Sequence, residues 1–126
     1  MKPIINYKEH CKVRIKDLDN TYTKHEVVKL LVMLLSHRKY KEAGIYSEYE
    51  LKNGDRVDVM IDFGDYSILI EIQENMSPTW KESIKNRDLE LGMNTIIIPL
   101  KDLSNNINRL TEQLKEHLIW KERINL

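Results

Sequence analysis

Cysteine is nearly absent from this chain, and so are long apolar runs. The single cysteine, Cys11, excludes a disulfide framework. Because the first residues also show no secretory signal, we expect the protein in a reducing cytoplasm. The longest uncharged apolar run, Leu30 to Leu35, is far shorter than the roughly 20 residues of a membrane-spanning helix. With no internal repeat and no low-complexity linker, the 126 residues are expected to form one domain.

The formal net charge is zero, but basic and acidic residues are unevenly distributed along the chain. Twenty basic residues match twenty acidic ones, yet residues 1–41 contain ten Lys/Arg and only four Asp/Glu. A basic part beside an acidic remainder suits a protein that binds phosphates with one part and cations with the other. Charge blocks are about as often plain solvated surfaces. Residues 1–22 are expected to form a basic arm or an edge strand.

Three β-rich runs occupy the middle of the chain. They read IYSEYEL, RVDVMIDF and SILIEIQEN, and they lie between Ile45 and Asn75. Turn residues separate them, and Asn53-Gly54 is a strong two-residue hairpin signal because both positions take a positive φ at little cost. The pattern predicts an antiparallel meander of three strands.

A helix is predicted before this meander, from Thr23 to about residue 38. Thr23 and Glu26 have the spacing of a capping box, in which each side chain satisfies the other's terminal amide. The body of the helix, VVKLLVMLL, is apolar nearly all round, which indicates burial on more than one side.

The remaining elements follow the meander. Ser77 and Pro78 begin a helix that should end near Leu91 and Gly92. Residues 94–100, NTIIIPL, form a continuous β-branched run, which predicts a strand buried on both faces and parallel to the third strand of the meander. A last helix is expected from residue 104 onward. The fold class is therefore α/β, with a central mixed sheet flanked by helices.

Two acids lie inside strands where acids are costly. Asp58 stands among β-branched residues, and Glu71 follows the apolar run Ile68-Leu69-Ile70. A buried charge without a partner costs several kcal/mol, so these positions favour a site over a structural role. Glu71 and Gln73 face the same side of their strand because the side-chain period is two. An Asp and a Glu-x-Gln on neighbouring strands can converge into a hard-cation site of oxygen ligands.

This arrangement resembles the PD-(D/E)XK nuclease superfamily, which includes type II restriction enzymes and archaeal Holliday junction resolvases. The matching positions are Glu26 or Glu48, then Asp58, then Glu71-Ile72-Gln73, and the resemblance spans residues 23–100. The stretch EIQENMSPTWKESIKNR also resembles competence-protein-type, CoiA-like members. The resemblance implies a restriction-endonuclease-like αβββαβα core and a DNA endonuclease that depends on Mg²⁺ or Mn²⁺.

The resemblance also implies roles for individual residues. The implied metal ligands are Asp58, Glu71 and the carbonyl of Ile72, with Glu26 or Glu48 as a further carboxylate. Gln73 stands where most members have a lysine, and a glutamine can only hydrogen-bond. Lys85, or else Lys81, is expected to supply the missing cation from the following helix. The predicted DNA-binding residues are Lys12, Arg14, Lys16, Lys81 and Arg87.

Several of these positions also have a structural explanation. The capping box alone accounts for Glu26, a solvated strand face accounts for Glu48, and Lys85 has the place of an ordinary exposed helix lysine. No spacing of His and Cys11 indicates zinc. Three functions remain open at this point: a homodimeric endonuclease that pairs through the last helix or Trp120, a nucleic-acid-binding module with an impaired site, and a protein-interaction subunit.

Overall fold

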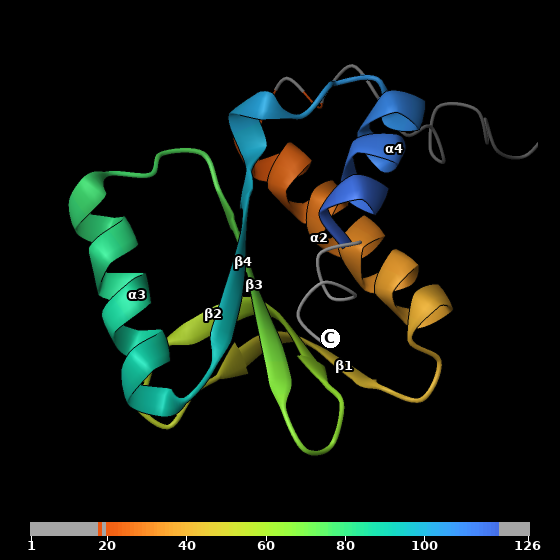
Figure 1. Cartoon of the computed structure of the whole chain (residues 1–126). Helices are drawn as coiled ribbons and strands as arrows, with labels where there is room; N and C mark the ends of the chain where they lie inside the picture. The colour runs from red at the N-terminus through yellow and green to blue at the C-terminus, as the bar shows by residue number, and fades with distance from the viewer. Residues whose placement is uncertain (1–17, 19, 119–126) are drawn as a thin grey trace, which may run out of the picture.

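A four-stranded mixed sheet forms the centre of the structure (Figure 1). The computed structural model describes residue 18 and residues 20–118. The strands lie in the order β1-β2-β3-β4, with the first three antiparallel and β4 parallel to β3. Their bounds are Gly44–Glu50 for β1, Arg56–Asp62 for β2, Ser67–Gln73 for β3 and Asn94–Pro99 for β4. The predicted meander and the parallel crossover are both confirmed.

Helices cover both faces of this sheet. Figure 1 shows α2 (Thr21–Lys39) and α4 (Ile107–Leu118) on one face and α3 (Pro78–Leu91) on the other. A short 3-10 turn, η2 (Leu100–Asp102), follows β4 directly. The order helix, three strands, helix, strand, helix confirms the predicted fold class and is consistent with a restriction-endonuclease-like core. No helix in the described part of the chain is long and apolar enough to cross a membrane.

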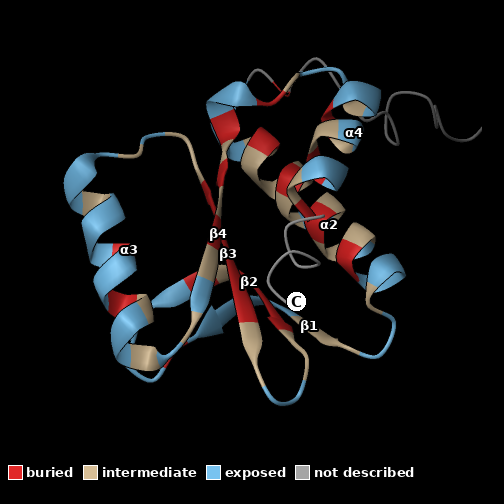
Figure 2. Cartoon of the chain, in the orientation of Figure 1, coloured by how far each residue is buried: buried red, intermediate tan, exposed pale blue. Residues whose placement is uncertain are grey.

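Each face of the sheet has its own apolar core (Figure 2). The larger core lies under α2 and α4, and the smaller core lies under α3. The larger core contains Val28, Val32, Val59, Ile61, Ile68, Ile70, Ile72, Ile96, Ile98, Leu100, Leu103, Leu110, Leu114 and Leu118. The smaller one contains Leu51, Val57, Met60 and Leu69, with Leu91 and Met93 packed against it. The difference in size means that the α2 face contributes most of the apolar burial.

The predicted capping box at the start of the first helix is wrong. The helix begins at Thr21, its N-cap is Asn20, and the Asn20 side chain accepts a hydrogen bond from the Thr23 amide at 3.1 Å. Asn caps helices as well as Thr does, so the earlier residue supplied the cap. Glu26 is thus released from capping and lies one turn inside α2. The last helix likewise begins at Ile107 rather than at residue 104, because Asn106 accepts from the Asn108 and Arg109 amides.

The second helix has the predicted ends. Ser77 is its N-cap and accepts a hydrogen bond from the Trp80 amide at 3.1 Å. Pro78 is the first helical residue, and Gly92 ends the helix with a φ of 68°. The hairpin prediction is wrong in type. Gly54 takes φ 92°, but Asn53 does not have a positive φ and instead accepts from the Asp55 amide at 3.0 Å. The resulting loop spans residues 51–55, between the Glu50↔Arg56 pair of the ladder.

Strand β4 is less buried than predicted. Ile96 and Ile98 point into the larger core, whereas Thr95 and Ile97 on the other face are half-buried. The strand is an edge of the sheet, and α3 covers it only in part, so a continuous β-branched run did not require burial on both faces. The predicted basic arm of residues 1–22 falls mostly outside the described residues, and so does Trp120.

Candidate functional site: a carboxylate pocket beside β2

Strands β2 and β3 stop pairing through their backbones at Asp58. Their ladder runs from Asp62↔Ser67 to Val59↔Ile70. Beyond it, the Ile72 amide donates to the Asp58 carboxylate Oδ2 at 2.7 Å, and the Asp58 amide lies 3.4 Å from Glu71 Oε1. The two acids therefore replace the ladder with side-chain hydrogen bonds. This exchange fixes both carboxylates at one point of the sheet.

The other side of Asp58 is irregular as well. Strand β1 pairs with β2 at Ser47↔Val59 and Tyr49↔Val57, and between these pairs Glu48 takes φ 50°. A positive φ is uncommon for a residue other than glycine. The alternation of β2 is interrupted here too, since Val59 belongs to the larger core and Val57 to the smaller one. The irregularity lets both Glu48 and Asp58 turn toward α2.

A pocket of about 780 Å³ opens where α2 meets these two strands. His25 from the first turns of α2 brings Nε2 to 3.3 Å from Asp58 Oδ1, and its Nδ1 lies 3.3 Å from Glu26 Oε2. The imidazole thus stands between two carboxylates from different elements. The pocket is lined by Thr21, Tyr22, His25, Glu26, Lys29, Glu48, Asp58, Ile72, Gln73, Glu74, Asn75 and Leu100.

Lys29 connects the two carboxylates between which the sequence did not decide. Its Nζ lies 2.9 Å from Glu26 Oε2 and 3.2 Å from Glu48 Oε2. The hydrogen bond from Lys29 lowers the pKa of Glu26. Burial lowers the pKa of Lys29, but the hydrogen bonds to Glu26 and Glu48 outweigh it, and the pKa lies above its usual value. Glu26 and Glu48 therefore both reach the pocket, and a charged lysine joins them.

Glu71 faces the opposite side of the sheet. Its carboxylate is buried, and its Oε2 lies 3.2 Å from Arg87 Nη1 of α3. Burial raises the pKa of Glu71, the Arg87 hydrogen bond opposes that shift, and repulsion from Asp58 adds to it. Glu71 does not line the pocket. Its hydrogen bond with a residue of the pocket comes from the Asp58 amide.

Arg87 is a structural partner rather than a surface cation. It is 5% exposed, and besides Glu71 it donates to Thr95 Oγ1 at 3.0 Å, while Asp88 Oδ1 lies 3.6 Å from its Nε. This burial argues against the predicted contact between Arg87 and DNA. The arginine neutralises an acid that the interior would otherwise disfavour.

The other predicted residues divide between the pocket and a separate groove. Gln73 and Ile72 line the pocket with Asp58. Lys81 and Lys85 instead line a groove between α3 and β4, on the far side of the sheet. The structure therefore does not bring Lys85 to the acids. Lys12, Arg14 and Lys16 lie outside the described residues.

Sequence reasoning missed His25 and Lys29. With Glu26 they stand at helical spacing on one face of α2, in the segment HEVVK. That spacing was the available signal, but the expected capping box gave Glu26 a structural role. The partner Glu48 is 19 positions from Lys29 in the chain, and local patterns do not report contacts of that kind.

The side chains at this point suit Mg²⁺ in kind. Carboxylate oxygens are hard ligands, and Mg²⁺ is usually held by one or two of them together with waters and substrate phosphates. Asp58 and Glu71 are such a pair, and their mutual repulsion is what a bound cation would relieve. Within the described residues, no group of three or more His, Cys, Asp or Glu side chains has an arrangement that could hold a metal ion. Of the two acids, only Asp58 lines the pocket, and Glu71 would share an ion with it only by turning from Arg87.

Comparisons with known proteins returned no relatives. No family model, no curated protein and no solved structure matches the chain.

Proposed function

We propose that the protein is a DNA endonuclease of the PD-(D/E)XK type that depends on Mg²⁺, or on Mn²⁺ in its place. The observation that supports this best is the meeting of Asp58 and Glu71 where the β2–β3 ladder ends, beside a pocket with two further carboxylates. The element order around that point is the one expected for this superfamily. In this proposal, Asp58 and Glu71 hold the ion, and the Ile72 carbonyl adds a ligand.

A bound divalent cation would supply two things to a phosphodiester: neutralisation of developing negative charge, and a hydroxide nucleophile at neutral pH. The chain's own residues prepare the site for it. The Ile72 amide orients Asp58 at 2.7 Å, and His25 restrains the second oxygen of that carboxylate. The Arg87 guanidinium, which extends from α3, orients the Glu71 carboxylate.

Lys29 takes the role that the superfamily usually gives to a lysine at the position of Gln73. Its ammonium has three donors, of which Glu26 and Glu48 accept two. Within the described residues no acceptor takes the third, which can donate to a phosphate oxygen or to the attacking water. Because Lys29 lines the pocket with Asp58 and Gln73, it is better placed for this than Lys85.

A second function, nucleic-acid binding without cleavage, has one specific observation in its favour. Three of the acids already have a cationic partner, since Glu71 pairs with Arg87 and Glu26 and Glu48 share Lys29. A site whose negative charge is partly compensated in this way has less need of a metal ion. The basic N-terminal third would then hold phosphates, and gel shifts that weaken with salt would occur without cleavage in any divalent metal.

A cleavage assay decides between the two functions. Linear, flapped and four-way-junction DNA is incubated with Mg²⁺ or Mn²⁺ and with wild type, Asp58→Asn or Glu71→Gln. Each substitution is expected to lower the rate at least about 100-fold, since each removes charge that acts on the reacting phosphate. Glu82→Gln, which changes an exposed carboxylate of α3, is the matched control. Circular dichroism verifies that each variant folds.

Metal binding gives a reading that does not depend on turnover. Paramagnetic broadening by Mn²⁺ should concentrate on Asp58 and its neighbours in wild type and be lost in Asp58→Asn. Folded variants that still cut DNA, or Mn²⁺ binding that does not require Asp58, would refute the assignment.

Two-fold symmetric cutting of a duplex or a junction requires two sites, so the proposal includes a homodimer. Analytical ultracentrifugation of the full chain, alone and with a four-way junction, measures this. A monomer on both samples would contradict the dimer and leave the chemistry of the site unaffected.

A further inference from the structure

A second, smaller cavity adjoins the carboxylate pocket and has the opposite charge. It measures about 120 Å³ and lies between the beginning of α2 and the turn η2. It shares Thr21, Glu74 and Leu100 with the larger pocket, so the two lie side by side. Its lining also includes Lys24 and Lys101, and we call it the lysine cavity.

Lys24 is the unusual residue in this cavity. It is only 9% exposed, yet within the described residues its ammonium has one hydrogen-bond acceptor, the Leu103 carbonyl. An ammonium has three donors, and a buried cation without an anionic partner is costly. Within the same residues, no carboxylate lies at ion-pair distance from Lys24, although Glu74 lines the cavity. The remaining donors and the missing counter-charge indicate a place for an anion.

Two further features favour an anion at this place. Lys101 adds a second positive charge from an exposed position on η2. The cavity also lies at the N-terminus of α2, a helix of 19 residues whose dipole attracts negative charge there. The lysine cavity thus contrasts with the adjoining pocket, whose lining includes the carboxylates of Glu26, Glu48 and Asp58.

We propose that the lysine cavity binds a backbone phosphate of the DNA strand next to the phosphate that is cut at Asp58. The proposal rests on the proposed function for the identity of the strand. A strand that crosses the two adjoining pockets meets carboxylates that can hold a cation in one and lysines that can hold a phosphate in the other. Lys24 and Lys101 then determine which way the strand runs through the site.

The test measures DNA binding under conditions in which nothing is cut. Fluorescence anisotropy follows a labelled single-stranded or duplex oligonucleotide with wild type, Lys24→Met, Lys101→Ala and the double variant, in EDTA over a series of salt concentrations. Each lysine that contacts a phosphate should reduce the slope of log affinity against log salt by about 0.7 to 0.9. The loss of affinity should not depend on the base sequence.

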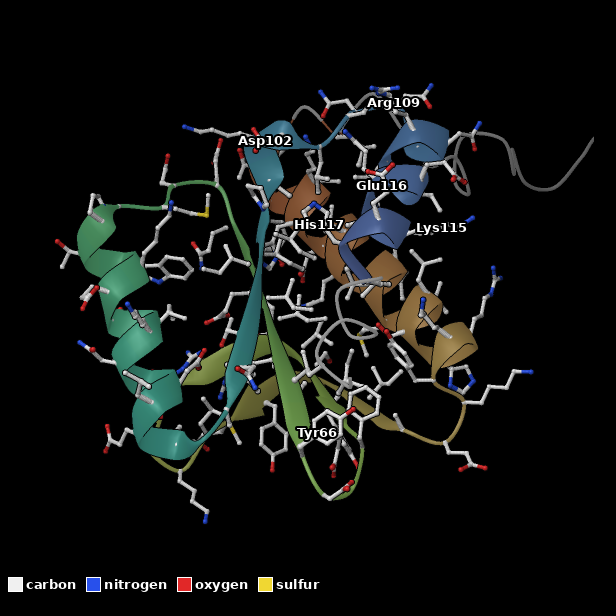
Figure 3. The ribbon with its side chains drawn as sticks, viewed as in Figure 1. Tyr66, Asp102, Arg109, Lys115, Glu116 and His117 are labelled. Atoms are coloured by element: carbon white, nitrogen blue, oxygen red, sulfur yellow. The ribbon has the colours of Figure 1, made fainter. Side chains whose placement is uncertain are left out.

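Lys115→Met is the matched control. Lys115 lies on the outer side of α4, away from β2 and β3 (Figure 3), and pairs with Glu112 at 3.1 Å. It should leave the slope unchanged. Because Lys24 is buried, its variant is also compared with Lys24→Arg, which retains the charge, and every variant is checked by thermal unfolding. Lys101→Ala changes an exposed residue and keeps the test valid even where Lys24→Met does not fold.

The outcomes separate this proposal from the nuclease assignment. Reduced salt slopes in protein that never cuts DNA would support the lysine cavity and refute the nuclease. Normal slopes for both lysine variants, in protein that cuts DNA, would refute the cavity alone. Inorganic phosphate and a mononucleotide are titrated as competitors. Tight binding of either one that requires Lys24, with oligonucleotide binding unaffected by the variants, would overturn the assignment to a strand.

Discussion

On the α2 side of the sheet, carboxylates line an open pocket, whereas on the α3 side one carboxylate is buried against an arginine. Glu26 and Asp58 belong to the first environment and Glu71 to the second. Asp58 and Glu71 nevertheless touch through the backbone of β2. Two neighbouring acids therefore lie in different dielectric surroundings, Asp58 at an open pocket and Glu71 in the protein interior.

The two surroundings shift acid pKa values in opposite directions. A lysine at 2.9 Å lowers the pKa of Glu26, which remains partly in contact with water. Burial raises the pKa of Glu71 even though Arg87 lies 3.2 Å away. Desolvation thus outweighs a good ion pair at the buried position, while the ion pair prevails at the exposed one. The comparison identifies Glu71 as the acid whose ionised form depends most on a cationic partner, which is Arg87.

The largest expected effect comes from removing the cationic partner of Glu71. Arg87→Met should lower the free energy of unfolding by about 3 to 5 kcal/mol, because it leaves a buried carboxylate without its partner. Urea denaturation at neutral pH measures the loss. The control is Lys85→Met, an exposed position of the same helix, which should stay within about 0.5 kcal/mol. A loss below about 1 kcal/mol in Arg87→Met would show that the pair is not a buried one.

Removing the lysine on the α2 side should affect catalysis more than folding. If the nuclease proposal holds, Lys29→Met should slow DNA cleavage by about 100-fold, since it removes a donor that acts on the reacting phosphate. Its cost in stability should be about 1 kcal/mol or less, because Glu26 and Glu48 remain partly hydrated. Cleavage kinetics at saturating Mg²⁺ and urea denaturation measure the two quantities separately. A wild-type rate in a folded Lys29→Met protein would exclude the role.

The pH dependence should distinguish the two acids in one experiment. Carbon-detected NMR titration should find Glu26 ionising below the ordinary value of 4.5 and Glu71 above it. Glu26, with a depressed pKa, stabilises the fold above 4.5, and that contribution is lost as the pH falls through its folded pKa. Glu71 has a raised pKa, so its contribution is present at low pH and is lost as the pH rises from 4.5 through its folded pKa.

Variants sharpen the same titration. Lys29→Met should raise the pKa of Glu26, because the hydrogen bond that lowers it is gone. Glu71→Gln should abolish the part of the stability profile that declines above pH 4.5. A Glu71 that ionises below Glu26 would reverse the comparison between the two faces.

The smallest effect is expected on the far side of α3. Lys81→Met and Lys85→Met should each change the cleavage rate by less than about twofold, since both lysines line a groove apart from the acids. The same cleavage assay as for Lys29→Met measures this. A large loss in Lys85→Met would instead assign the role of the catalytic cation to Lys85 of α3, as the superfamily resemblance implied.

Local patterns were sufficient for most of the fold. The β-branched runs predicted all four strands, and Ser77, Pro78 and Gly92 predicted both ends of α3. Errors occurred where an asparagine side chain made a local hydrogen bond that the pattern did not include. Asn20 displaced Thr23 as the N-cap of α2, and Asn53 formed a side-chain turn instead of taking a positive φ.

The candidate site was predictable only in part. Acids inside β-branched runs indicated Asp58 and Glu71, because burying a charge is costly wherever the chain folds. Glu26 and Glu48 were proposed as alternatives, and the structure brings both to the pocket through Lys29. Lys85 was expected to supply the cation of the site and Arg87 to contact DNA, but Lys85 lines another groove and Arg87 is buried against Glu71.

The sequence by itself therefore determined the order of the elements and the two costly acids. Both depend on local properties, namely side-chain periodicity and the energy of an unpaired charge. Only the tertiary structure decided which cations meet those acids. A helix can rotate about its axis without any change in its sequence pattern, so packing against the sheet turned Lys29 and Arg87 inward and Lys85 outward. The contacts at 2.9 Å and 3.2 Å that distinguish the two faces exist because of that packing.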